Sequence, residues 1–277
     1  MKKVQRILMA LAVCSLSIVA VGCSSDEKKN TTTDNTKENS KLSNEELLKK
    51  VNEASKSIKN SKAKVTNKTS LDVLGKKTET IFNMDIIVGS DPTIVKVTGN
   101  MIALGRTINI NTYITEDAVY ALDPETNEWF NIKDETTKKA MQSQKNASNL
   151  DGMLEMMNAL DKNLTVEEKD SEYEITYSGN DDAVKEALKK ALSNNQQDLG
   201  QVLDNIKLDK LELKYKVDKK TFMPKEYEVK TTIKYPNKDK ETVFQMELKV
   251  EFSEINEVKG LTIPDEVKNA KEWKRSN

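Results

Sequence analysis

Cysteine and histidine are the side chains that most often carry chemistry, and this sequence restricts both. The chain of 277 residues has no histidine. Histidine bases, histidine metal ligands and Ser-His-Asp or Cys-His sites are therefore excluded. The two cysteines, Cys14 and Cys23, lie within the first 23 residues. The rest of the chain has no thiol nucleophile, disulfide or thiolate metal site. Enzymes that use carboxylates, lysine, serine or tyrosine remain possible.

Carboxylates are abundant, with 45 Asp and Glu residues, but they form no recognisable motif. Asp123, Glu125 and Glu128 bracket a turn, and such a group raises the question of calcium. A calcium loop needs set spacings, a central glycine and a distal glutamate, all of which are missing here. We interpret the turn as a solvated hairpin tip and expect no metal site. No local motif nominates a glycosidase pair either, so we expect a non-catalytic protein without a cofactor.

Cys23 has a context that suggests one specific modification. Basic residues in 1–6 precede an apolar stretch, 7–21, and Gly22-Cys23. This is the pattern of a secretory signal peptide, and it is short for a membrane-spanning helix, which needs about 20 apolar residues. The stretch Ala-Val-Gly-Cys that ends at Cys23 resembles a bacterial lipobox, with alanine where leucine is preferred. An ordinary signal peptide with a chance cysteine is the alternative.

The lipobox resemblance implies that residues 1–22 are removed and that Cys23 receives a diacylglyceryl group, with palmitate among its acyl chains. Two acyl chains hold a protein stably on a bilayer. We therefore expect a lipoprotein on the extracytoplasmic face of the cell membrane. Removing residues 1–22 leaves 255 residues with 41 basic and 45 acidic side chains. This balance gives no reason to expect nucleic-acid binding.

The chain after the cysteine divides into a tether and one domain. Residues 24–41 contain no apolar side chain, so 23–42 is interpreted as the lipidated cysteine with a disordered tether. The domain is expected over 43–277. It begins at Ser43 and Glu46, which fit a capping box before an amphipathic helix over about 43–60.

Most of the domain alternates between apolar and polar residues with the period of a β-strand. We predict about eleven strands joined by short links, hence an antiparallel sheet. Helical spacing recurs at about 150–160, 180–192 and 197–206. The predicted fold is α+β: one curved antiparallel sheet with three or four helices packed on its concave face.

Three stretches, 114–133, 215–229 and 261–273, resemble in their order the LolA/LppX-like superfamily, and more narrowly a group of Gram-positive lipoproteins with that fold. The resemblance implies a half-open barrel plugged by helices, with a cavity between sheet and helices that holds acyl chains or another apolar molecule. It implies no catalytic residues, because the superfamily shares none.

The alternation along each predicted strand indicates which side chains could line such a cavity. The apolar side of the longest strands and the methionine-rich helix supply the ligand-lining candidates: Phe82, Met84, Ile108, Ile110, Met153, Met156, Met157, Tyr215, Tyr227, Phe244 and Met246. Core filling is the competing interpretation of the methionines. Lysines on the outer side of the late strands alternate with glutamates, which favours a solvated mixed-charge face over a polyanion site. Trp129 and Phe130 must point to opposite faces, and we expect Trp129 to be buried.

The sequence therefore predicts a membrane-anchored extracytoplasmic lipoprotein that binds a lipid-like ligand without catalysis. The alternative is a ligand-free protein-interaction module of the cell envelope, acting in assembly, signalling or sporulation.

Overall fold

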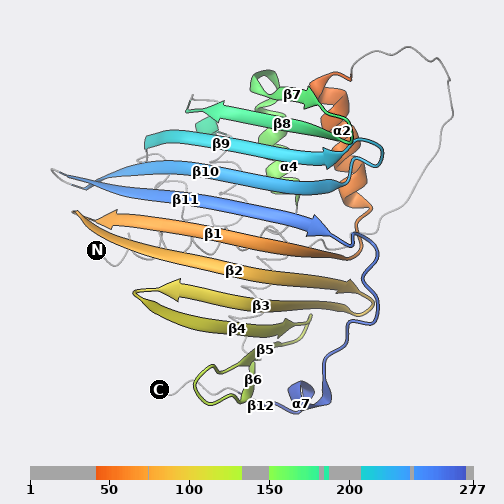
Figure 1. Ribbon diagram of the computed structural model, residues 1–277, viewed down its shortest axis with the longest axis vertical. Coiled ribbons are helices and arrows are strands. Elements are labelled where there is room, and N and C mark those ends of the chain that lie inside the picture. Colours follow the sequence, from red (N-terminus) through yellow and green to blue (C-terminus); the bar gives the residue numbers. More distant parts are fainter. Residues whose placement is uncertain are drawn as a thin grey trace.

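In the part of the chain that the structure describes, a single open sheet of twelve strands forms the body of the protein (Figure 1). The computed structural model describes residues 42–73, 75–132, 150–180, 184–186, 207–237 and 240–272. The strands are β1 (Ser61–Val73), β2 (Lys76–Ser90), β3 (Thr93–Ala103), β4 (Arg106–Ile114), β5 (Val119–Leu122), β6 (Trp129–Ile132), β7 (Thr165–Glu168), β8 (Glu172–Gly179), β9 (Lys207–Asp218), β10 (Pro224–Asn237), β11 (Lys240–Ser253) and β12 (Lys271–Glu272).

The sheet order is β12-β6-β5-β4-β3-β2-β1-β11-β10-β9-β8-β7. Every pair is antiparallel except β12 with β6, so the sheet is mixed and stays open rather than closing into a barrel. The α+β half-barrel fold is confirmed. The strand number exceeds the expected eleven because β12 has two residues, too few for alternation to reveal.

The first and last long strands meet at the centre of the sheet. β1 pairs with β11 from Lys62 opposite Ser253 to Val73 opposite Thr242. The early strands β2–β6 therefore extend to one side of this pair, and the late strands β7–β10 to the other (Figure 1). Contacts between distant parts of the sequence join the two halves into one sheet.

The helices defined within the described residues are α2 (Asn44–Lys56), α4 (Leu150–Ala159), the 3-10 helix η2 (Asp161–Asn163) and α7 (Asp265–Lys268). The predicted capping box is confirmed at α2. The Ser43 Oγ accepts a hydrogen bond from the Glu46 N–H at 3.2 Å, and the Glu46 carboxylate accepts one from the Ser43 N–H at 3.0 Å. These bonds satisfy donors at the helix start and fix where the helix begins.

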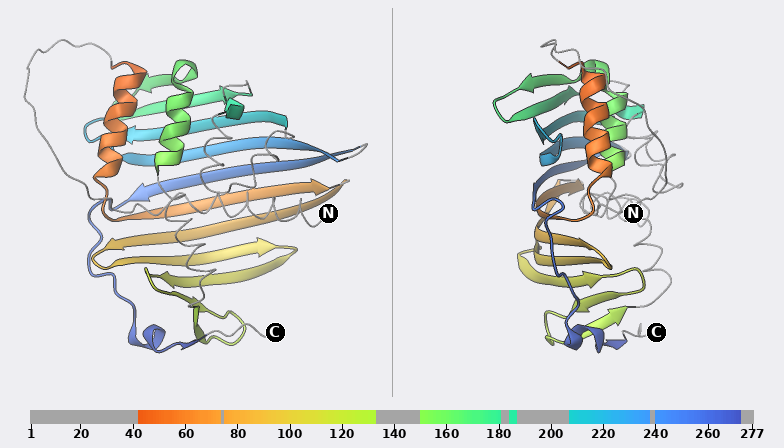
Figure 2. Two further views of the ribbon diagram at one scale, coloured as in Figure 1. Left: turned by 180° about the vertical axis from the view of Figure 1, so that it is seen from behind. Right: turned by 90° about the vertical axis from the view of Figure 1, so that its right-hand side faces the viewer.

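α2 and α4 lie beside each other on one face of the sheet, over its late strands (Figure 2). We call this the inner face. The apolar side of α2, with Leu47, Leu48 and Val51, is buried against it. Alternate side chains of the strands complete this main core, as the one-sided alternation in the sequence requires.

A second, smaller core lies on the opposite, outer face. Ile94 precedes Val95 on β3, and only Val95 packs on the main core, so Ile94 points outwards. Ile94 and Tyr113 are buried together with Val267 of α7. Trp129 is half-buried beside them, with its ring centroid 5.7 Å from that of Tyr113. Trp129 thus joins this second core without being fully buried as expected, while Phe130 is half-buried as well.

Several predictions fall on residues outside the described ranges. These are the signal peptide 1–22, Cys23 and the tether, and nearly all of the helices expected over 180–192 and 197–206. Within 184–186 the backbone is helical, and Val184 is fully buried.

Candidate ligand-binding face

The inner face of the sheet brings together the side chains nominated from strand phase. Cross-strand register places Tyr215 opposite Tyr227, and Phe82 opposite Met101, which in turn is opposite Ile108. Directly opposite residues in an antiparallel pair share a face. The helix methionines Met156 and Met157 join the same core from α4. Met153 lies in the backbone range of α4, but its side chain is outside the described part of the structure.

The part of the inner face over the late strands is filled. Tyr215, Tyr227, Phe244, Met156 and Met157 are all buried. The rings of Tyr215 and Tyr227 meet edge to face with centroids 6.4 Å apart, a favourable geometry for aromatic pairs. These five candidates pack as a hydrophobic core in this conformation.

The two tyrosine hydroxyls share the same apolar environment. Burial raises the pKa of the Tyr215 hydroxyl, opposed in part by the Ser55 hydroxyl of α2. Burial also raises the pKa of Tyr227, and the neighbouring Tyr215 adds to that rise. The Tyr215 hydroxyl has no hydrogen bond of normal geometry. Both tyrosines therefore stay protonated and act as apolar bodies rather than as acid-base groups.

The inner face over the early strands is less covered. Met84 is buried, whereas Phe82 and Ile110 are half-buried. Ile108 on β4 is 39% exposed. Met246 on β11, close to the centre of the sheet, is also half-buried. This apolar strip, formed by Phe82, Met101, Ile108 and Ile110, is the least covered part of the nominated surface.

A polar patch interrupts the apolar inner face where β1 and β10 approach its centre. Asn67, Thr69 and Thr231 are buried there. The Thr69 hydroxyl donates to the Thr80 carbonyl at 3.4 Å, and the Thr231 hydroxyl donates to the Lys210 carbonyl at 3.1 Å. This polar centre of β1 and β10 lies inside the core. Thr231 lies in the same row of the sheet as Thr69, because both stand opposite Met246 of β11.

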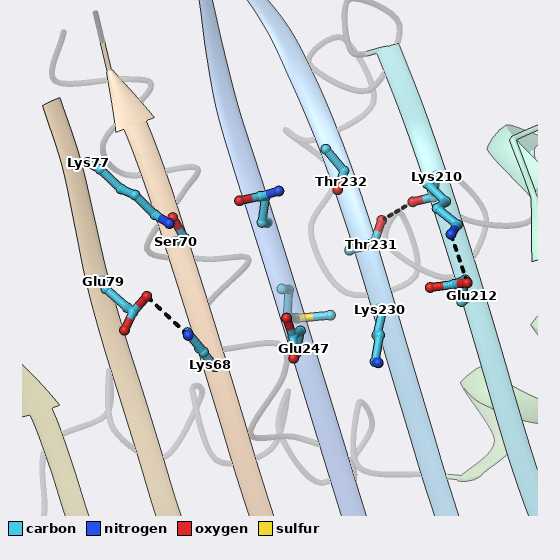
Figure 3. Close-up of a pocket in the computed structure, with 12 residues that line it drawn as sticks. Lys68, Ser70, Lys77, Glu79, Lys210, Glu212, Lys230, Thr231, Thr232 and Glu247 are labelled. Carbon is cyan, nitrogen blue, oxygen red and sulfur yellow. Dashed lines mark hydrogen bonds and ion pairs between the residues drawn. The ribbon is translucent and has the colours of Figure 1, made fainter. Parts of the chain in front are cut away.

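The outer face over the central strands is charged and hollowed. Its 250 Å³ hollow spans β2, β1, β11, β10 and β9 (Figure 3). Across it, the adjacent strands β9, β10, β11 and β1 carry side chains of alternating charge that stand opposite one another: Glu212, Lys230, Glu247 and Lys68. Ion pairs join Lys68 to Glu79 at 3.3 Å and Lys210 to Glu212 at 2.8 Å within the same hollow. A lining in which opposite charges alternate suits water better than an apolar ligand.

A second outer hollow of 450 Å³, over β8–β10, also has charged side chains in its lining, among them Lys214 and Glu228. Lys214 pairs with Glu228 at 3.4 Å, and Lys216 pairs with Glu226 at 2.8 Å. Burial alone would raise the pKa of Glu226, but hydrogen bonds from Lys216 and Lys249 hold it below its usual value. The predicted mixed-charge outer face is confirmed.

The carboxylates at the hairpin turns accept hydrogen bonds from backbone N–H groups of their own turns. The backbone N–H groups of Glu125 and Thr126 donate to Asp123 and lower its pKa. Asp218 likewise accepts from the Thr221 N–H at 2.9 Å, which lowers its pKa. Both carboxylates stabilise hairpin turns. In the described residues, no group of acidic side chains is arranged to hold a metal ion. No helix of the described ranges is long and apolar enough to cross a membrane.

The fold defines the class of protein as an open β-sheet half-barrel with helices on its inner face. The chain belongs to a family of unknown function, DUF6612, whose model matches residues 43–272. No curated protein matches the sequence.

Solved structures give distant matches. LprF from Mycobacterium bovis is 9% identical with a TM-score of 0.46, covering 81% of this chain and 97% of LprF. A beta-barrel-like protein of domain of unknown function DUF1849 from Brucella abortus is 7% identical with a TM-score of 0.23, covering 71% of this chain and 100% of that one. A DUF1329 family protein from Desulfovibrio piger is 9% identical with a TM-score of 0.23, covering 79% and 93%. Likenesses this distant assign no ligand or partner.

Proposed function

We propose that this protein is a lipid-anchored, extracytoplasmic binding protein that holds an apolar or amphiphilic ligand against the inner face of its sheet. The membrane anchor is the diacylglyceryl group on Cys23, and the protein is non-catalytic. In this proposal the half-barrel is of the LolA/LppX type, and its ligand is lipid-like. The localisation is the extracytoplasmic side of the cell membrane.

The observation that carries the proposal is the partly uncovered apolar strip on the inner face. Phe82, Met101 and Ile110 remain half-buried, and Ile108 is 39% exposed. Covering such a strip with a hydrocarbon chain stabilises the complex by about 0.8 kcal/mol per buried CH₂ group. The polar centre beside it, with Thr69 and Thr231, offers oxygen atoms to the polar part of an amphiphile.

The buried tyrosines and methionines have a different role in this proposal. They support the sheet from beneath α2 and α4, and they reach a ligand only when those helices move. The ligand therefore binds first along the strip on β2–β4.

A specific observation favours the alternative of a ligand-free interaction module. Tyr215 and Met157 are almost completely buried, at 1% and 2% exposure, so the region below the helices is already filled. A protein whose inner face is filled throughout would instead use its surface to bind a partner in envelope assembly, signalling or sporulation.

Two isoleucines of similar exposure on opposite faces separate these functions. Ile108 lies on the inner face with 39% exposure, and Ile102 lies on the outer face of the neighbouring strand with 36% exposure. Ile108→Lys should weaken binding of a fluorescent fatty acid at least about tenfold, because a charge in an apolar contact is costly. Ile102→Lys is the matched control and should bind the probe like the wild type. Equal effects of the two variants would reject the inner face as the site.

A further inference from the structure

Exposed apolar side chains gather on one hairpin of the sheet. Among the described residues, the large hydrophobic side chains that are exposed are Ile102, Leu104 and Ile108. All three belong to the β3–β4 hairpin, and Leu104 at its turn is 81% exposed. Single exposed hydrophobic residues need no explanation, but three on one hairpin make its tip apolar at the turn and on both faces.

The three side chains surround the end of the hairpin. Ile102 pairs with Thr107 on the outer face, whereas Ile108 pairs with Met101 on the inner face. Leu104 lies between them in the turn. A hairpin that packs by one face places its apolar residues on that face alone. This distribution instead suits an element that enters an apolar medium end first.

Leucine is also an unfavourable residue for the turn itself. Leu104 has φ +51° and the following Gly105 has φ +72°. Such two-residue turns usually take asparagine, aspartate or glycine at these positions, because a side chain with a Cβ is strained at positive φ. An exposed leucine therefore costs conformational energy here, and at 81% exposure it gains little packing within the described part of the chain.

Cations flank this apolar tip. Arg106 is exposed beside Leu104, and Lys76 and Lys77 are exposed at the neighbouring β1–β2 turn. None of the three forms an ion pair within the described part of the chain. The nearby acids are engaged, since Asp72 accepts from the Gly75 N–H at 2.8 Å and Glu79 pairs with Lys68 at 3.3 Å. Lys77 stands opposite Asp72 on β1, so among the described residues Arg106 and Lys76 are the cations around the exposed leucine and isoleucine that have no acid directly across the strand pair.

The strands β1, β3 and β10 all end at this one end of the sheet (Figure 1). We propose that the β3–β4 hairpin tip, Ile102–Ile108, docks on an anionic lipid surface, with Leu104 in the interfacial layer and Arg106, Lys76 and Lys77 at the head groups. This inference rests on the proposed membrane anchor. The 18 residues between Cys23 and Leu42 reach at most about 60 Å, longer than the roughly 50 Å of the 15-residue strand β2.

A fluorescent label on the lipidated full chain tests this docking. Once Cys14 is removed with the signal peptide and Cys23 is acylated, a Thr107→Cys variant carries a single free thiol. The thiol is labelled with an environment-sensitive dye, and the protein is reconstituted into phosphatidylcholine vesicles with or without phosphatidylglycerol. An Asp117→Cys variant, labelled just beyond the opposite end of β4, is the matched control.

The label at residue 107 should shift to blue and be quenched by brominated lipids in vesicles that contain phosphatidylglycerol, whereas the label at residue 117 should report water. In the Thr107→Cys background, Leu104→Ser should lower insertion about tenfold, from the loss of one buried leucine. Arg106→Gln should lower it about fivefold, from the loss of one cation at the surface.

Two results would overturn docking. One is a label at residue 107 that stays as water-exposed as the label at residue 117. The other is a blue shift without vesicles that grows with protein concentration, which would assign the tip to a second copy of the chain. Failure of the proposed ligand binding is a separate result, because it appears as lost fatty-acid binding whatever the position of the tip.

Discussion

The rings of Tyr215 and Tyr227 meet edge to face across β9 and β10, and both phenols are fully enclosed beneath the helices. The hydroxyl of Tyr215 lacks a hydrogen bond of normal geometry. This pair marks the filled part of the inner face, and it makes the stability of the protein sensitive to alkaline pH.

Burial raises the folded-state pKa of both tyrosines above the unfolded value of about 10. Below that pH the folded and unfolded states are both protonated, so stability is unaffected. Above it the unfolded chain releases protons that the folded protein retains, and the free energy of unfolding falls by about 1.4 kcal/mol per pH unit for each tyrosine. Urea titrations between pH 8 and about 11 should show this fall.

Lysine ion pairs also weaken at high pH, so variants are needed to isolate the tyrosines. The double variant Tyr215→Phe/Tyr227→Phe should flatten the alkaline slope and change stability at pH 7 by only about 1 kcal/mol, because the hydroxyl of Tyr215 makes no hydrogen bond of normal geometry. Tyr235→Phe, at a half-buried tyrosine of β10, is the control for the loss of a phenol hydroxyl. A slope that persists in the double variant would show that the buried phenols are not its source.

Gly99 on β3 should be intolerant of any side chain. It has φ +150°, and a Cβ atom there would lie 2.0 Å from the Asn83 carbonyl oxygen and 2.8 Å from the Met84 Cα of β2. We expect Gly99→Ala to lower the free energy of unfolding by about 3 kcal/mol or more, since backbone must move. Gly105→Ala, with φ +72° and no atom within 4 Å of its Cβ, should cost about 1–2 kcal/mol. Equal losses in denaturant titrations would contradict the close approach of β2 and β3.

The anchor is tested through Cys23. Cells grown with a clickable palmitate analogue should label the wild-type chain and a Cys14→Ala variant, because only Cys23 becomes the mature N-terminus in this proposal. Cys23→Ala should lose the label and appear in the soluble fraction. Continued labelling of Cys23→Ala, or its full retention on membranes, would rule out this anchor.

Local signals were sufficient for much of the fold. The capping box at Ser43 and Glu46 placed the start of α2, because it depends on residues three apart. The alternation of β9–β11 placed the buried side chains of those strands, because one face of the sheet is apolar and the other is charged.

Long-range pairing was not predictable from such signals. The central contact between β1 and β11 joins residues about 190 positions apart, as the Lys62–Glu254 ion pair shows. The second core on the outer face was missed because Leu261, Ile263 and Val267 follow no strand or helix period. The candidate site was predicted only as a strand phase. The alternation along each strand indicated which side chains share a face of the sheet. It could not show that one half of this face is buried and the other half is a partly exposed strip, because that depends on where α2 and α4 pack.

The central claim is that the inner face holds an apolar ligand, and lipid extraction tests it most directly. The chain from residue 24, produced without the anchor, is extracted with organic solvent and the extract is analysed by mass spectrometry, beside displacement of a fluorescent fatty acid. We predict a co-purifying lipid or amphiphile and saturable displacement that Ile108→Lys impairs and Ile102→Lys does not. A clean extract together with no probe binding would contradict the claim and favour an interaction module with a filled core.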